Sequence, residues 1–281
     1  SIVKAYKASK NPFVYIYAVW SIVFVLLPLV ILLGNSVLVT TGGESHFSMA
    51  NFARVLDPLY LKVIWRSLKL ALLTTLICLI LGYPMAMILA KSGFGKGSVM
   101  VILLIIPMWM NFLARTYAWM SLLDGAGILS TFLKSLGLPG LNVLYTEGAV
   151  ILGMVYNFLP FMILPIYSVL IKIDHSLIEA AEDLGAAPMK VFSKITLPLS
   201  VSGVITGITM VFLPAVSTFV ISRLLGGGKV NMVGNLIETQ FLTSSDWGFG
   251  SALSVVVMVL ILISMFIMNR FGDDEQGGGL F

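Results

Sequence analysis

Residues 176–198, SLIEAAEDLGAAPMKVFSKITLP, form the one polar and well-punctuated helical segment between long apolar runs of this sequence. Ser176 is followed three residues later by Glu179, the spacing of a capping box, which predicts that a helix begins there. Gly185 offers the left-handed residue with which helices commonly end. Pro188 fits the first turn of a second helix, where it loses no helical hydrogen bond. The stretch therefore predicts two short helices joined by a sharp glycine turn.

The order and spacing of this stretch resemble the EAA motif of ABC-importer permeases, which is E-A-A, three residues, Gly, nine residues and I-x-L-P. The last two residues of the motif are expected to close the second short helix. In the family, the segment is a cytoplasmic coupling helix that docks into a cleft on the ATPase subunit. An ordinary amphipathic hairpin shares single elements of the pattern, but not the whole string. The matching residues are Glu179, Ala180, Ala181, Gly185, Ile195, Leu197 and Pro198.

The composition excludes a soluble domain. Hydrophobic residues make up 58% of the chain and charged residues 11%, whereas about a quarter of the residues of a soluble domain are charged. The mean hydropathy is +1.01. The net charge of +4 is spread along the chain without a dense basic run, which gives no case for nucleic-acid binding. The single cysteine, Cys78, and the two distant histidines, His46 and His175, predict neither a disulfide framework nor a metal site.

The apolar runs predict an all-α integral membrane protein with six transmembrane helices in one permease domain, residues 1–281. A helical span needs about 20 apolar residues. Residues 38–67 are expected to form a loop with an interfacial helix, and the polar tail after Arg270 is expected to be disordered. The predicted spans are about 13–37, 68–89, 99–119, 149–170, 199–221 and 251–268, with the EAA segment 176–198 between the fourth and the fifth.

The orientation follows from the EAA segment rather than from the loop charges. Placing that segment in the cytoplasm also places both termini there, and nine of the 17 lysines and arginines lie inside. The positive-inside signal is therefore weak. Lys4, Lys7 and Lys10 precede the first apolar run, which exceeds a typical signal-peptide core and is expected to be an uncleaved first span.

Four further stretches extend the resemblance along the chain, and they are similar to the permease B subunit of spermidine/putrescine ABC importers. They read LDPLYLKVIWRSLKLALLTTLICLILGYPMA, IIPMWMNFLARTYAW, NFLPFMILPIYSVL and SSDWGFGSAL. This resemblance implies one half of a type I importer of the bacterial cytoplasmic (inner) membrane, working by alternating access. Its implied partners are a second homologous permease subunit, two ATPase subunits that bind ATP and Mg, an extracytoplasmic polyamine-binding protein and the lipid bilayer. No Walker A string occurs, so this chain is predicted to be no enzyme and to carry no cofactor itself.

A polyamine is a polycation, so its path needs carboxylates, amide oxygens or aromatic faces. The cores of the six predicted spans contain no Asp or Glu. Cation–π contacts, worth about 0.5–2 kcal/mol each, are the alternative. Trp109, Tyr117 and Tyr156 are the aromatic candidates, and Asn111 and Asn157 are the amide candidates. The competing interpretation places the aromatic residues in the interfacial belt of the membrane.

Three charged residues need a separate account. Arg115 lies in the middle of a predicted span, where a basic residue costs about 2.5–3.5 kcal/mol on insertion scales. Because an arginine facing the pore would repel a cation, we expect a structural or gating role for it. Glu238 and Asp246 lie in the last outer loop. They could meet the binding protein or attract cations, or they could be solvated loop charges.

Other solutes and other classes of protein remain open from the sequence. Ferric iron, an organic phosphonate or an opine are alternative substrates, because related importers share the EAA loop. A secondary transporter is expected to carry intramembrane ionisable groups or inverted repeats, and neither is visible. An integral-membrane enzyme would need intramembrane His, Asp or Glu constellations, which these spans lack.

Overall fold

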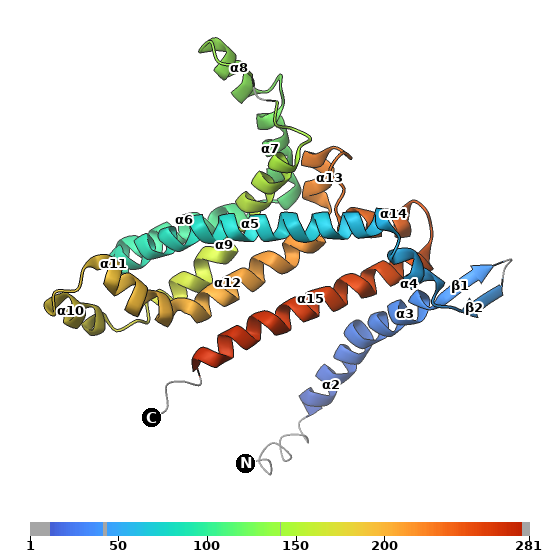
Figure 1. Cartoon of the computed structure of the whole chain (residues 1–281), viewed down its shortest axis with the longest axis horizontal. Coiled ribbons are helices and arrows are strands. Elements are labelled where there is room, and N and C mark those ends of the chain that lie inside the picture. Colours follow the sequence, from blue (N-terminus) through green and yellow to red (C-terminus); the bar gives the residue numbers. More distant parts are fainter. Residues whose placement is uncertain (1–11, 42–43, 141, 277–281) are drawn as a thin grey trace. The chain divides into compact units, whose positions relative to one another are not determined.

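The computed structural model describes residues 12–41, 44–140 and 142–276, which are almost entirely helical (Figure 1). This confirms the predicted all-α membrane fold. The described chain falls into two compact units. Unit 1 comprises Ser1–Leu61 and Ile237–Val259, and unit 2 comprises Lys62–Leu236 and Leu260–Phe281. The N-terminal lysine cluster and the last five residues lie outside the described residues.

Among the described residues, five helices are long and apolar enough to cross a membrane, and a bent pair makes up to six. The predicted count of six therefore holds if the bent pair is one span. The five helices are Tyr15–Ser36, Pro58–Lys91, Glu147–Leu170, Pro188–Ser217 and Trp247–Met268, and the pair is Val99–Trp109 with Phe112–Ser135.

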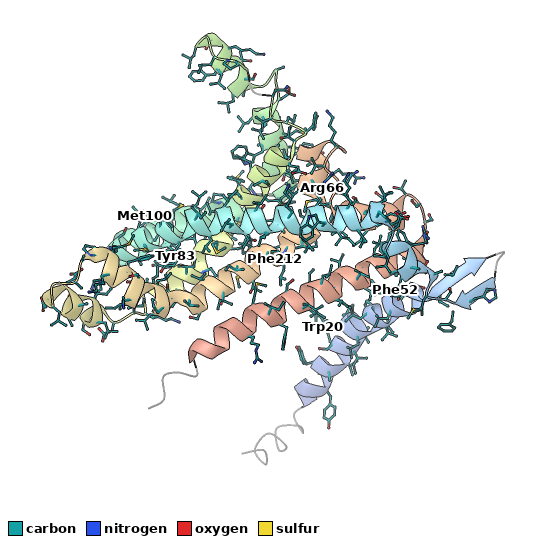
Figure 2. The ribbon with its side chains drawn as sticks, viewed as in Figure 1. Trp20, Phe52, Arg66, Tyr83, Met100 and Phe212 are labelled. Carbon is teal, nitrogen blue, oxygen red and sulfur yellow. The ribbon has the colours of Figure 1, made fainter. Side chains whose placement is uncertain are left out.

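Unit 1 begins with the first span, formed by α2 (Pro12–Ser21), the π-helical turn η1 (Ile22–Leu26) and α3 (Leu27–Ser36). None of the side chains from Tyr15 to Asn35 is buried. Trp20, labelled in Figure 2, is 54% exposed. An all-apolar helix of this kind is suited to a lipid environment rather than to water.

A short hairpin and helix follow the first span in unit 1. Strands β1 (Leu38–Thr41) and β2 (Glu44–Phe47) pair antiparallel, with Leu38 opposite Phe47, and α4 (Ala50–Val55) comes next. The buried side chain of Asn51 donates from Nδ2 to the carbonyls of Ser36 (3.1 Å) and Leu38 (3.0 Å). These two bonds fasten α4 to the end of the first span.

An ion pair joins α4 to the start of the last span, α15 (Trp247–Gln276). Arg54 Nη1 lies 2.8 Å from Asp246 Oδ2, and its guanidinium stacks 4.0 Å from the centre of the Phe249 ring. Asp246 Oδ1 also accepts from the backbone N–H of Phe249 at 3.0 Å, so this aspartate caps α15. Burial alone would raise the pKa of the Asp246 carboxyl, but the hydrogen bonds from Arg54 and Phe249 outweigh it and hold that pKa below its usual value.

We expect Asp246→Asn, which retains a capping oxygen but loses the charge, to lower the free energy of unfolding at neutral pH by about 0.5–1 kcal/mol, because the ion pair is partly exposed. Since the folded pKa is lowered, this stabilisation is present above the unfolded pKa of about 3.9 and is lost as the pH falls through the folded pKa. Thermal unfolding midpoints of wild type and variant should therefore differ at pH 7 and converge in acid.

Asp57→Asn is the matched control for this titration. Asp57 accepts from the backbone N–H of Leu59 at 2.9 Å, ahead of α5 (Pro58–Lys91), and makes no ion pair with any described residue. Its substitution removes a capping charge without breaking an ion pair. An Asp246→Asn difference that is as large in acid as at pH 7 would contradict the assigned ion pair.

In unit 2, α9 (Glu147–Leu170) packs against α5 and along the helix of the fifth span. The core contains Leu70, Met154, Met162 and Ile163, all fully buried. Close approach depends on glycines. A Cβ on Gly82 of α5 would lie 3.0 Å from the Met162 side chain. Gly203 and Gly207 of the fifth span approach α9 as closely, since a Cβ on either would lie within 3.1 Å of an α9 backbone atom.

The second helix begins earlier than predicted. A single helix of 34 residues, α5, replaces the expected interfacial helix and the span that follows it. Pro58 stands at its start, where a missing N–H does no harm. Basic residues in its first half are tolerated because an acidic residue of α9 faces them, as described below.

The predicted third span is wrong as a straight helix. It breaks into α6 (Gly93–Trp109) and α7 (Phe112–Leu123), and the apolar helices on the two sides of the break meet at 91°. Pro107 removes one helical hydrogen bond just before the break, and Met110 is extended. Asn111 then starts α7, because its Oδ1 accepts from the backbone N–H groups of Leu113 (2.9 Å) and Ala114 (3.2 Å).

The fifth span also differs from its prediction. α11 (Pro188–Val191), the π-helical turn η2 (Phe192–Thr196) and α12 (Leu197–Ser217) are continuous, so Pro198 lies in the first turn of α12 and closes nothing. We call these 30 residues, Pro188–Ser217, the rod. At 1.5 Å per residue it is about 45 Å long.

Helices also replace loops that the sequence predicted beyond the rod. α13 (Val220–Gly226) and α14 (Val233–Leu242) occupy half of the expected last outer loop, residues 223–250. α15 continues to Gln276, so the tail after Arg270 is helical as far as that residue rather than disordered. The short helix α8 (Ile128–Ser135) lies in the loop after α7.

Candidate coupling segment and translocation pathway

The candidate coupling helix α10 (His175–Asp183) has its N-cap two residues before the predicted one. Asp174 is the N-cap, because its Oδ1 accepts from the backbone N–H of Ser176 at 3.0 Å. The predicted capping box of Ser176 and Glu179 is therefore wrong. Asp174 lies two residues upstream of Ser176, has an extended backbone and a charged acceptor, and therefore caps the helix in its place. The backbone N–H of Ser176, together with its hydroxyl, holds the pKa of the Asp174 carboxyl below its usual value.

The end of α10 is the predicted glycine stop. Gly185 has a φ of +77°, in the left-handed region. Its N–H donates to the carbonyl of Glu182 at 2.8 Å, and the N–H of Ala186 donates to the carbonyl of Ala181 at 3.0 Å. This pair of bonds is a Schellman motif. It turns the chain sharply into Pro188, where the rod begins.

The candidate coupling segment is largely exposed. None of the nine residues of α10 is buried. Glu179 and Ala180 are exposed and Ala181 is half-buried. Two large apolar side chains stand out, because Leu184 is 89% exposed and Met189 is 75% exposed. Small and acidic groups of α10 are thus exposed together with apolar groups of the turn and helix that follow it.

The last part of the EAA string belongs to the rod itself. Ile195 is half-buried in the π-helical turn, and Leu197 and Pro198 are exposed in the first turn of α12. Near this end, Ser200 of α12 and Tyr83 of α5 share a hydrogen bond of 2.6 Å (Tyr83 is labelled in Figure 2). The coupling segment is therefore joined directly to a membrane span that is hydrogen-bonded to its neighbour.

Two of the five predicted pathway residues lie at the break between α6 and α7. Trp109 is the last residue of α6 and is 86% exposed. Asn111 caps α7, so its amide oxygen is already engaged by two backbone N–H groups. Tyr117 is 49% exposed and makes no ring contact with another described residue. Contact of any of them with a substrate stays a prediction.

The structure brings Tyr156 together with two residues of α7. The guanidinium carbon of Arg115 lies 6.0 Å from the centre of the Tyr156 ring, and the Trp119 ring meets that ring edge-on at 5.3 Å. Arg115 is 9% exposed, and its Nε has no hydrogen-bond partner among the described residues. Sequence reasoning missed Trp119, although its position four residues after Arg115 places both on one helical face.

Asn157 points away from solvent. It is 3% exposed, and its Nδ2 donates to the carbonyl of Gly153 at 2.8 Å. Its Oδ1 has no hydrogen-bond partner in the part of the chain that the structure describes. A buried amide oxygen of this kind is an acceptor available to a donor group.

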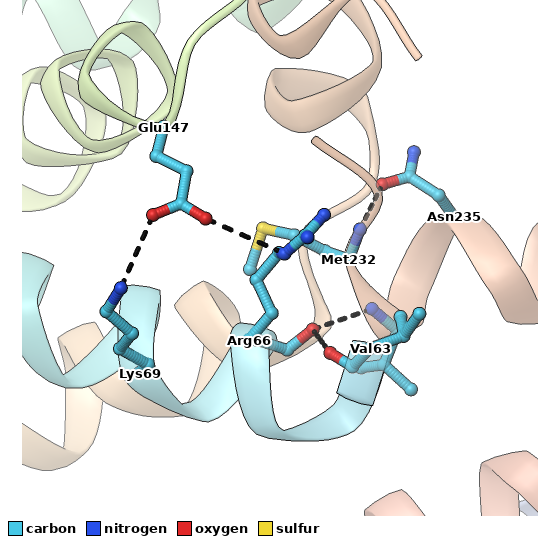
Figure 3. Close-up of polar contacts among 8 residues, drawn as sticks. Val63, Arg66, Lys69, Glu147, Met232 and Asn235 are labelled. Carbon is cyan, nitrogen blue, oxygen red and sulfur yellow. Dashed lines mark hydrogen bonds and ion pairs between the residues drawn. The ribbon is translucent and has the colours of Figure 1, made fainter. Parts of the chain in front are cut away.

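A charged bridge between α5 and α9 was not predicted (Figure 3). Glu147, in the first turn of α9, lies 3.6 Å from Arg66 Nε and 3.5 Å from Lys69 Nζ. The three side chains are 30–54% exposed, so the bridge is a weak electrostatic link. Arg66 and Lys69 are three residues apart on α5, and this spacing is the only sequence signal that could have suggested a shared partner.

The two acidic outer-loop candidates are not simple solvated charges. Glu238 is half-buried within α14. Asp246 caps α15 and pairs with Arg54. Both therefore have structural surroundings that the loop prediction did not provide. Their predicted meeting with a binding protein stays a prediction.

A multi-span helical chain whose exposed helix–glycine–helix segment continues into a span is a membrane permease of the EAA class. The chain belongs to the family described as binding-protein-dependent transport system inner membrane component, whose model matches residues 3–274.

Curated relatives span nearly the whole chain. It is 41% identical over 256 residues to the spermidine/putrescine transport system permease protein PotB of Salmonella typhimurium (strain SL1344), which covers 89% of each protein. It is 40% identical to the protein of the same name from Escherichia coli (strain K12), covering 89% of this chain and 93% of that one. A putative 2-aminoethylphosphonate transport system permease protein of Salmonella typhimurium (strain LT2) is 27% identical, with 84% of each covered.

The fold is also that of a solved transporter. A chain in the crystal structure of a bacterial ABC transporter involved in the import of the acidic polysaccharide alginate superimposes with a TM-score of 0.80 at 15% identity. The match covers 97% of this chain and 98% of that chain. The chain is therefore a multi-pass inner membrane permease with an ABC importer fold.

Proposed function

We propose that this chain is the permease subunit of an ATP-driven importer that carries polyamines, spermidine and putrescine, into the cytoplasm. The observation that carries the proposal is the 40–41% identity, over 89% of the chain, to permeases named for these two solutes. The uninterrupted EAA string supports the importer class. The assignment of the solute rests on the relatives rather than on any contact in the pathway.

The proposed assembly contains a second homologous permease, two ATPase subunits that bind ATP and Mg, and an extracytoplasmic polyamine-binding protein. The exposure of α10 and of the residues after it supports docking on an ATPase subunit, because Leu184 and Met189 are large apolar side chains that no described residue covers. An exposed apolar patch beside charged residues is typical of a protein interface. Both termini are then cytoplasmic, on the side of α10.

In the proposed mechanism, closure of the ATPase dimer moves α10, and α10 moves the rod because the two are joined by a tight turn at Gly185. The movement alternates access to a central path. The Asn157 amide oxygen is the acceptor that we assign to a substrate ammonium, since the described spans supply no buried carboxylate and the Arg115 guanidinium already lies over the Tyr156 ring. Trp109 and Tyr117 are secondary candidates.

One observation favours a second solute class. Arg115 is buried without a carboxylate partner among the described residues, and such a cation suits an anionic substrate. An organic phosphonate is such an anion, and one relative is named for it at 27% identity. We rank the phosphonate second, because that relative is more distant than the polyamine permeases.

The test is the ATPase activity of the reconstituted complex with its binding protein, titrated with spermidine, putrescine and 2-aminoethylphosphonate. We expect either polyamine to stimulate hydrolysis and to enter proteoliposomes, with liposomes lacking the binding protein as the control. Stimulation by the phosphonate alone would keep the coupling role and discard the polyamine. Hydrolysis that responds to no solute, in a complex that binds ATP, would count against the coupling role itself.

A further inference from the structure

Asn235, in the first turn of α14, gathers three bonds from a short region. Its Oδ1 accepts from the hydroxyl of Ser222 and from the backbone N–H of Met232 at 3.1 Å. Its Nδ2 donates to the carbonyl of Phe219 at 2.8 Å. The side chain is 8% exposed, so these bonds are shielded from water. One asparagine thus holds the chain break that follows the rod.

The end of the rod lies directly against the same turn. A Cβ on Gly234 would collide with the carbonyl oxygen of Ser217, the last residue of the rod, and would lie 2.9 Å from that of Thr218. These two carbonyls lie at a helix end, where backbone acceptors lack helical partners. The start of α14 and the end of the rod are therefore in backbone contact, and only glycine permits it.

A third link attaches this turn to α5 (Figure 3). The backbone N–H of Val233 donates to Ser67 Oγ at 2.7 Å, and the same hydroxyl donates to the carbonyl of Val63 at 3.0 Å. Ser67 is fully buried. We call the group Ser67, Ser222, Met232, Val233 and Asn235 the clasp. It fixes the Ser217 end of the rod to the first half of α5.

The clasp and the Tyr83–Ser200 hydrogen bond lie toward opposite ends of the rod. Ser200 is near the coupling segment, and Ser217 is 17 positions farther along, about 25 Å at 1.5 Å per residue. Two separated attachments prevent a helix from pivoting or sliding against its neighbour. The rod and α5 therefore have to move together as long as both attachments hold.

We propose that Asn235 is a positioning residue for transport, which passes the movement of the coupling segment from the far end of the rod to α5. The inference rests on the proposed function, because it requires that an ATPase subunit drives α10. Asn235 acts through Phe219 and Met232 and needs no contact with substrate. Without it, α10 still docks and ATP is still hydrolysed, but the end of the rod no longer carries α5 with it.

The test compares Asn235→Ala and Ser67→Ala with Asn51→Ala in the full reconstituted complex. Asn51 is the matched control, since it is as buried as Asn235 and also binds two backbone carbonyls, but both of those carbonyls belong to unit 1. We expect both clasp variants to keep basal ATPase activity and to lose about tenfold in stimulation by the loaded binding protein, a size typical of coupling between sites. Asn51→Ala should keep its stimulation.

Retained stimulation in Asn235→Ala, or an equal loss in Asn51→Ala, would overturn the proposal. If Asn235→Ala does not assemble, Gly234→Ala and Ser67→Ala test the proposal in its place. Gly234→Ala pushes the start of α14 away from the end of the rod, and Ser67→Ala removes the acceptor of the Val233 N–H. A structural role alone would lower basal and stimulated activity in parallel. The wild type first establishes which solute stimulates it, and the variants are tested with that solute. Failure of the polyamine assignment is then distinct from failure of the clasp.

Discussion

Replacing Gly185 by valine is expected to uncouple ATP hydrolysis from transport, with the protein still inserted in the membrane. Gly185 has a φ of +77°, and a β-branched residue pays a conformational penalty of about 1–3 kcal/mol in that region. The population of the native turn should then fall by about tenfold or more, because each 1.4 kcal/mol of free energy changes an equilibrium constant by a factor of ten. Solute uptake per ATP hydrolysed, measured in proteoliposomes, should fall accordingly.

Gly185→Asn is the control that separates backbone strain from crowding. Nothing lies within 4 Å of a Cβ at this position, so a side chain has room. Asparagine tolerates the left-handed region better than other residues, and this variant should retain most of the coupling. An unchanged uptake rate in Gly185→Val would sink the idea. Equal losses in both variants would show that the missing side chain, rather than the backbone angle, is what the turn requires.

The second large effect is expected at Gly203, where leucine should prevent the rod from packing on α9. A Cβ at Gly203 would lie 2.9 Å from the carbonyl oxygen of Pro165 and 3.1 Å from Ile166 Cα. Gly207, one turn on, meets Met162 in the same way. Because backbone atoms cannot swing aside, the two helices must separate. The cost should reach or exceed about 3 kcal/mol, the upper part of the range for overpacking.

We expect Gly203→Leu to lower the yield of assembled complex several-fold and to lower its thermal unfolding midpoint. Gly34→Leu is the control, because nothing lies within 4 Å of a Cβ at Gly34, in the exposed first span. It should insert and assemble as the wild type does. Normal assembly of Gly203→Leu would be incompatible with the packing of the rod on α9 described here.

The parts of this fold that follow from local sequence were predictable. The end of a helix at a glycine depends only on the helix and on one residue with positive φ, and Gly185 is that residue. Long apolar runs define spans, because backbone groups in the bilayer core have to be hydrogen-bonded within the segment, as they are in a helix. The sequence placed the fourth span within two residues of its observed start at Glu147. The spacing of the EAA string sufficed to place the coupling segment between two spans.

The errors arose where several local signals compete. Asp174 and Ser176 are both residue types that cap helices. The cap is the residue whose backbone is extended, and the sequence alone does not show which of the two that is. Pro107 and Pro198 both sit in apolar runs, yet the first precedes a break and the second lies in a first turn. The difference depends on the flanking residues, since Asn111 supplies a new cap after Pro107.

The candidate site was less predictable than the fold, because its contacts join distant segments. Glu147 meets Lys69 across 78 positions, and Val233 meets Ser67 across 166. The periodicity of residues within a single helix contains no information about pairs that join different helices. Trp109 and Tyr156 were selected as aromatic residues in spans, but only the structure assigns Arg115 and Trp119 to the Tyr156 ring.

The wide turn Phe192–Thr196 holds an extra residue between the coupling segment and the membrane part of the rod. In an α-helix each residue advances the chain by about 100° around the axis, so a deletion there rotates everything that precedes it. A π-helical turn instead takes up one residue more than the α turn it replaces while completing the same circuit of the axis. Deleting the exposed Ser193 would therefore let this turn relax to an α turn with little rotation of α10. The rod thus tolerates a change of one residue in this turn without changing the face that the segment presents.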